Sequence, residues 1–97
     1  MAVVIVTRFK GNPDFVPMLK EAAAILKKHG AMSVRGGRCY AGSYAGQVVA
    51  ATALADWNAY GRLMQGLLAD PDWQRLYQDT MTKFELQDRS LIAAEDF

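Results

Sequence analysis

The chain has little of what most catalytic and metal-binding sites are built from. Its 97 residues include one cysteine, Cys39, and one histidine, His29. A single cysteine cannot form a disulfide within the chain, and no two Cys or His residues have the spacing of metal ligands. We therefore expect a reducing, cytoplasmic compartment, no metal and no cofactor.

An excess of one charge and a long apolar run are also missing. Eleven basic and ten acidic side chains leave a net charge of +1, so we expect neither nucleic acid nor a membrane as partner. The apolar residues 1–6 are too few to span a bilayer, and no basic residue precedes them as in a signal peptide.

What the chain has in excess is apolar residues. Apolar residues make up 52% of it, against about 45–50% in ordinary globular domains. A chain of this length has room for one core. We therefore expect residues 1–97 to form a single domain that covers part of its apolar surface by pairing with a second copy.

The first third of the chain predicts a strand and then a helix. Residues 2–9, AVVIVTRF, are rich in β-branched side chains and are apolar at both odd and even positions, which predicts a strand covered on both faces. Asn12, Pro13 and Asp14 supply an N-cap, a preset backbone angle and a first-turn carboxylate, so a helix is expected to begin there and to end at His29.

The rest of the chain predicts a hairpin, a broken helix and a last strand. Residues 31–40 and 47–55 are predicted strands, and Gly36-Gly37 indicates a bulge or a close backbone approach. Asp56 and Asp70 each cap a helix. The expected inward residues of these two helices are Trp57, Tyr60, Met64, Leu67, Leu68, Leu76, Tyr77, Thr80, Met81 and Phe84. Residues 86–94 are the predicted last strand.

This order, β-α-β-β-α-β, is typical of the α+β ferredoxin-like class, in which a four-stranded antiparallel sheet carries its helices on one face. The other face then has no cover within the chain, although its strands carry apolar residues on both sides. A second copy packed sheet to sheet is the simplest cover, so we expect a homodimer.

Three segments carry a family resemblance: the strand AVVIVTRF, the hairpin end TALAD and the broken helix LLADPDWQRLYQDTM. On these segments the chain resembles, over nearly its whole length, the dimeric α/β-barrel superfamily. That superfamily includes antibiotic-biosynthesis-type monooxygenases, muconolactone isomerase-like enzymes, polyketide cyclases and many small proteins of unassigned role. The resemblance implies a homodimer with face-to-face sheets.

The resemblance also implies a cleft between sheet and helices, where some relatives bind aromatic or polyketide molecules and several act without metal or flavin. Trp73 stands where the polyketide cyclases carry a catalytic histidine, so the cyclase chemistry is not carried over. The Asn–His pair with which haem-degrading relatives hold haem has no assignable counterpart here.

Two residues are candidates for direct chemistry. His29 shares a helical stripe with Ile25 and Leu26, and it is either a general base that faces the cleft or a helix-end residue favoured by the dipole. Cys39 is either a nucleophile or a small buried hydrophobe, and no second histidine or cysteine is present to activate it. In both cases we favour the structural role.

The arginines also have two interpretations. Arg35 and Arg38 flank Gly36-Gly37 and could hold a ligand carboxylate or phosphate. We favour the other interpretation, in which they are exposed strand charges or pair with Asp or Glu across the dimer. Arg8 is either a cation of the ligand pocket or an exposed strand end, and the sequence does not decide between them.

The aromatic residues are the strongest sign of a ligand site, because rings with polar tips line ligand clefts. Plain core packing would produce the same spacing. The leading hypothesis is a small-molecule-binding homodimer, a cofactor-independent monooxygenase or isomerase acting on an aromatic or lactone-like compound, for which His29 is the one candidate base although we favour its structural role. The alternative is a non-catalytic assembly module. The residues expected to bind the compound are Tyr40, Trp57, Tyr60, Trp73, Tyr77 and Arg8.

Overall fold

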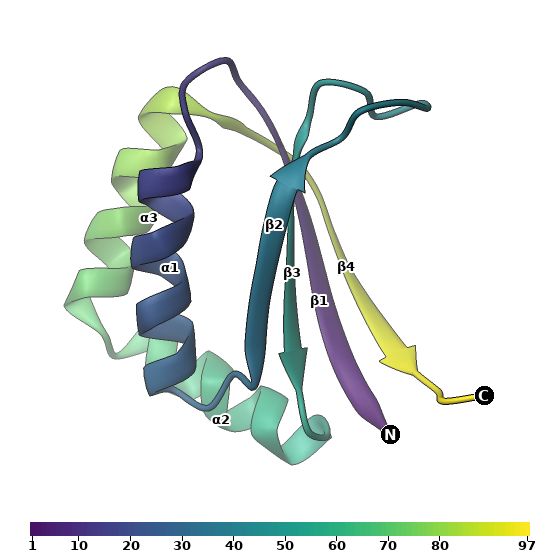
Figure 1. The fold of residues 1–97 in the computed structure, drawn as a ribbon. Coiled ribbons are helices and arrows are strands. Elements are labelled where there is room, and N and C mark those ends of the chain that lie inside the picture. The colour runs from purple at the N-terminus through teal and green to yellow at the C-terminus, as the bar shows by residue number, and fades with distance from the viewer.

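The computed structural model describes all 97 residues and has the predicted order of elements (Figure 1). The strands are β1 (Ala2–Lys10), β2 (Ser33–Arg38), β3 (Val48–Leu54) and β4 (Glu85–Ala94), and the helices are α1 (Val16–Lys28), α2 (Trp57–Leu68) and α3 (Pro71–Lys83). The strands form one antiparallel sheet in the order β2-β3-β1-β4. The predicted α+β, ferredoxin-like class is confirmed.

The sheet has one covered and one uncovered face. On β1 the residues Val3, Ile5 and Phe9 are buried against the helices, while Val4 and Val6 point the other way and are half-buried. No helix lies on that second side (Figure 1). We call it the open face; it carries Val4, Val6, Arg8, Arg35, Val49, Ala51, Asp88 and Ile92. Cover on both sides of β1, as the sequence predicts, is therefore not provided within one chain.

The main core lies between the sheet and the helices. Its fully buried side chains include Val3, Leu54 and Leu63. The predicted inward side of α2 was wrong in part: Trp57 and Leu68 are exposed, whereas Leu63 and Ala59 are buried. Residues 59, 63 and 67 are spaced by four and form one face of the helix, and this face rather than the neighbouring aromatic one packs on the sheet.

The predicted start of the first helix was also wrong. α1 begins at Val16, with Phe15 as the N-cap residue, and the Asp14 carboxylate accepts a hydrogen bond from the Val16 N–H at 3.0 Å. The cause is Pro17. A helix that began at Pro13 would place the Pro17 ring against the carbonyl of residue 13, a clash that interior prolines cannot avoid.

The two predicted aspartate caps are confirmed. Asp56 accepts a hydrogen bond from the Ala59 N–H at 2.8 Å, and Asp70 accepts one from the Asp72 N–H at 3.0 Å. Asp70 and Pro71 thereby end α2 and begin α3 within three residues. This corner determines where the aromatic residues of α3 point.

Gly36 confirms one of the two predictions made for the glycine pair. A Cβ atom at this position would collide with the Leu19 side chain of α1, so the glycine permits a close approach of helix and sheet. The pairing of β2 with β3 runs without a bulge. The register shift of this sheet lies instead between Arg8 and Phe9, where β1 pairs with β4.

Candidate functional site

A cavity of about 820 Å³ lies between the covered face of the sheet and the helices. All seven elements contribute to its 22 lining residues, of which 16 are hydrophobic. Ile5, Thr7 and Thr52 are buried at the sheet side. Five lining residues stay exposed, and they belong to the end of α2, to α3 and to β4: Leu68, Gln74, Gln78, Arg89 and Leu91. The mouth of the cavity therefore opens between α3 and the edge strand β4.

Three of the predicted binding residues lie on this cavity. Tyr60 comes from α2, and Trp73 and Tyr77 come from α3; all three are half-buried. The cap at Asp70 places Trp73 in the first turn of α3, and Tyr77 follows one turn later. Their rings give the cavity apolar walls, and the phenol and indole groups bring hydrogen-bond donors to those walls.

The other two predicted aromatic residues lie elsewhere. Tyr40 is 99% exposed in the loop after β2. Trp57 is half-exposed and does not line the cavity, but its ring packs edge to face against Tyr60 with 5.9 Å between ring centroids. Trp57 therefore touches the site only through a residue that lines it.

Arg8 is on the open face, away from the cavity. Its guanidinium lies 3.2 Å from the Asp88 carboxylate and 4.5 Å from the centroid of the Tyr44 ring. Neither of its two sequence interpretations describes this arrangement. Arg8 links β1, β4 and the loop between β2 and β3.

His29 lies outside the residues that line the cavity. Its Nε2 atom is 2.7 Å from Asp70 Oδ2, and Lys28 Nζ is 2.8 Å from the same oxygen. The hydrogen bond from Lys28, and then that from His29, lowers the pKa of the Asp70 carboxyl, and the Asp70 carboxylate raises the pKa of Lys28. The imidazole also packs directly on Gly66 of α2, so these contacts join the end of α1 to the corner between α2 and α3.

Sequence reasoning missed Arg89, the one charged residue of the cavity lining. Its Nε atom donates to Thr7 Oγ1 over 3.4 Å. The alternation of residues 86–94 gives no signal for it, because Leu86 pairs with Phe9 but Arg89 pairs with Thr7 across the register shift. The irregularity exchanges the faces of β4, and only the structure reveals it.

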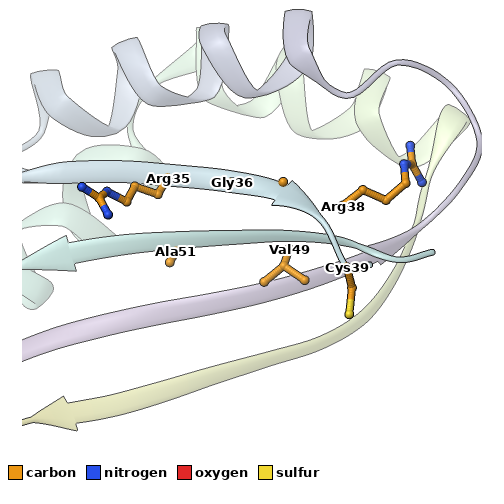
Figure 2. Close-up of a pocket in the computed structure, with 7 residues that line it drawn as sticks. Arg35, Gly36, Arg38, Cys39, Val49 and Ala51 are labelled. Carbon is orange, nitrogen blue, oxygen red and sulfur yellow. The ribbon is translucent and has the colours of Figure 1, made fainter. Parts of the chain in front are cut away.

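A second, shallow hollow of about 360 Å³ lies at β2 and β3 and includes Arg35, Arg38 and Cys39 (Figure 2). Arg38 does not offer its charge there. Its guanidinium donates to the carbonyls of Gly11, Gly46 and Pro13 at 2.9, 2.8 and 3.2 Å. The Cys39 thiol donates to the Ala41 carbonyl at 3.2 Å. Arg38 thus ties two loops together.

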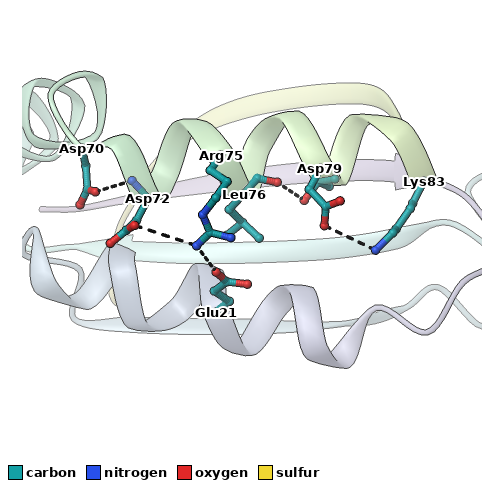
Figure 3. A network of polar contacts seen from close by, with 8 residues as sticks. Glu21, Asp70, Asp72, Arg75, Leu76, Asp79 and Lys83 are labelled. Carbon is teal, nitrogen blue, oxygen red and sulfur yellow. Dashed lines mark hydrogen bonds and ion pairs between the residues drawn. The ribbon is translucent and has the colours of Figure 1, made fainter.

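The outer side of α3 carries a polar network (Figure 3). Arg75 lies 2.9 Å from Glu21 of α1 and 4.0 Å from Asp72, and Lys83 lies 3.4 Å from Asp79. These pairs are solvent-exposed, so each contributes little to stability. No group of three His, Cys, Asp or Glu side chains is placed to hold a metal ion, and no helix is long and apolar enough to cross a membrane.

Solved structures share this fold. SnoaB from Streptomyces nogalater, described as a cofactor-independent oxygenase, matches 99% of this chain and 95% of its own with a TM-score of 0.74 at 18% identity. An uncharacterised NIPSNAP domain protein from Burkholderia xenovorans matches 100% of this chain and 97% of its own with a TM-score of 0.74 at 22% identity.

A Chloroflexus aurantiacus protein, provisionally assigned as an antibiotic biosynthesis monooxygenase, matches 100% of this chain and 96% of its own with a TM-score of 0.69 at 10% identity. No family model and no curated protein matches the sequence. At these identities the likeness establishes the fold, and the resemblance read from the sequence is confirmed at that level.

Proposed function

We propose that this chain binds a small ring-containing molecule in the cavity between sheet and helices and acts on it as a cofactor-independent oxygenase or isomerase. The cavity itself is the observation that carries the proposal. Its volume of about 820 Å³ lies within the range usual for ligand sites, and its walls are mostly apolar with a few polar groups, as such sites are. The oxygenase activity of SnoaB, a protein of the same fold, supports the choice of reaction.

The residues of the cavity suit a reaction in which negative charge develops on a bound ring. Tyr60, Tyr77 and Trp73 bring donor groups to an apolar chamber, and Arg89 brings a positive charge to its mouth. Donors that are already in place stabilise a developing oxyanion more strongly where water is excluded. In this proposal the three aromatic residues bind and orient the substrate, and no role falls to His29.

The test is thermal unfolding in the presence of flavins, haem, quinones and aromatic acids. A ligand at a hundred times its dissociation constant should stabilise the protein by about 2.7 kcal/mol. Any compound that raises the melting temperature is then tested for oxygen consumption and for isomerisation. If no compound shifts the melting temperature, the ligand-binding proposal fails and the assembly module becomes the better account.

We further propose that the chain forms a homodimer through its open face. Val4, Val6, Val49, Ala51 and Ile92 give this face an apolar centre that no part of the chain covers. Exposed apolar patches of this kind mark interaction surfaces. A second copy supplies an identical, self-complementary patch, as two-fold dimers require.

A further inference from the structure

Arg89 is the part of the cavity that a purely apolar ligand would leave unused. It is the only charged residue of the lining, and no acidic residue lies among the other 21. Arg8 and Arg75 form ion pairs with carboxylates, and Arg38 is occupied by backbone carbonyls, but Arg89 forms no ion pair. A guanidinium without a counter-charge beside apolar walls is suited to bind an anion.

The arginine is also held in position. Thr7 lies opposite Arg89 in the pairing of β1 with β4, and its buried hydroxyl accepts a hydrogen bond from Nε at 3.4 Å. This bond uses Nε and leaves the two terminal nitrogens, whose N–H groups match the two oxygens of a carboxylate. The guanidinium therefore stays on the cavity side of the sheet with its fork unoccupied.

The long polar side chains of the cavity lining lie at its mouth, whereas its three threonines, Thr7, Thr52 and Thr80, are buried. Gln74 and Gln78 of α3 are exposed there together with Arg89 of β4, whereas Met64 and Leu76 lie on the apolar walls. The Gln74 amide nitrogen donates to the Leu68 carbonyl at 2.7 Å, which fixes that side chain at the rim. A ligand that fits this distribution has an apolar body and one polar end.

We infer that the cavity takes an organic monoanion: an apolar ring system that packs between Tyr60, Trp73 and Tyr77, with one carboxylate, or ionised phenol or enol, bound by Arg89 at the mouth. The inference rests on the proposed function, since it requires the cavity to hold a ligand. A single cation disfavours polyanions such as nucleotides, and burying that cation under a neutral ligand leaves it unpaired.

A matched pair of probes tests this inference. 2-Naphthoate and 2-naphthamide have nearly the same shape and differ in charge, so their dissociation constants for the wild-type protein isolate the contribution of the anion. We expect 2-naphthoate to bind about tenfold or more tightly than 2-naphthamide, the gain typical of a charge-assisted hydrogen bond over a neutral one. Equal affinities would overturn the anion site but not the ligand-binding proposal. If neither probe binds while a neutral compound of the thermal screen does, the anion site alone fails; if no compound of that screen binds either, both proposals fail.

Two variants locate the effect. Arg89→Gln should weaken 2-naphthoate binding about tenfold or more and leave 2-naphthamide within about twofold. Arg62→Gln removes the same charge from an exposed position of α2 that does not line the cavity, and it should leave both probes unchanged. An Arg89→Gln variant that binds 2-naphthoate as the wild type does, or that loses both probes equally, would contradict the assignment.

Discussion

Gly36 permits a close approach of α1 to the sheet, and its neighbour Gly37 provides the control. Because a Cβ at residue 36 meets the Leu19 side chain and the space around residue 37 is open, we expect Gly36→Ala to lower the free energy of unfolding by roughly 1–3 kcal/mol. Gly37→Ala should change it by less than about 0.5 kcal/mol. Urea titration of both variants measures this. Equal effects would mean that the close approach is unimportant.

Asp70 is the residue with the clearest pH signature. Its pKa is lower in the folded chain than its ordinary value of 3.8, so the ionised carboxylate stabilises the fold above that pH, and the contribution is lost as pH falls further. Asp70→Asn keeps an acceptor for the Asp72 N–H but removes the charge that Lys28 and His29 contact. The variant should melt below the wild type at neutral pH, and the difference should shrink below pH 3.8.

Lys28 sets the alkaline limit of the same contact. Its pKa is raised, so its contribution to stability is present below its ordinary value of 10.5 and is lost as pH rises above it.

Asp79→Asn serves as the control for Asp70→Asn, because the exposed pair of Asp79 with Lys83 is weak. Thermal melts across the acid range provide the comparison. An Asp70→Asn difference that stays constant with pH would show that charge is not its cause.

Single residues were also where sequence reasoning was least complete. The aspartate caps were predictable because capping is local chemistry between neighbours in the chain. The contact of His29 with Asp70 joins residues 41 positions apart, and no periodicity encodes it. Arg89 was hidden for a similar reason, since the register shift near Arg8 exchanges the faces of the last strand.

Among the elements, the loops next to β2 depend on Arg38. Its guanidinium holds the carbonyls of Gly11 and Pro13 before α1 and of Gly46 before β3. We expect Arg38→Gln to release both loops. The amides of Gly46 and Gln47, which bond to Cys39 and Tyr44, should then exchange hydrogen several-fold faster.

The matched control is Arg35→Gln, three residues earlier on the same strand, because Arg35 makes no hydrogen bond to either loop. The amides of the central strand β1 should keep their protection in both variants, which separates local opening from global unfolding. Unchanged exchange at residues 46 and 47 in Arg38→Gln would show that the loop holds without the clamp.

Element order was predictable because alternation, caps and glycines act over short distances, and the boundaries were less so. The sequence predicted that α1 starts at Asn12-Pro13, but because of Pro17 it starts at Val16. The face that α2 turns to the sheet was set by packing of Ala59, Leu63 and Leu67, which the more conspicuous aromatic residues of that helix obscured.

For the whole molecule, the open face makes a testable prediction of assembly. Val6 lies near its centre on β1, so Val6→Asp should place a charge in the proposed interface and convert a dimer into a monomer of 10.7 kDa. Val16→Asp, at an exposed position of α1, should leave the assembly unchanged. Light scattering after gel filtration gives the masses. A wild-type protein that is already monomeric would refute the homodimer.

The cavity is a property of the whole molecule, since all seven elements line it. The sequence predicted its place and three aromatic residues that line it, Tyr60, Trp73 and Tyr77, but not Arg89. The most direct test of its role is an amide NMR titration of the wild-type protein with 2-naphthoate. The account predicts the largest shift changes around Thr52, Tyr77 and Arg89. Changes confined to Val49 and Ala51 on the open face, or none at all, would contradict it.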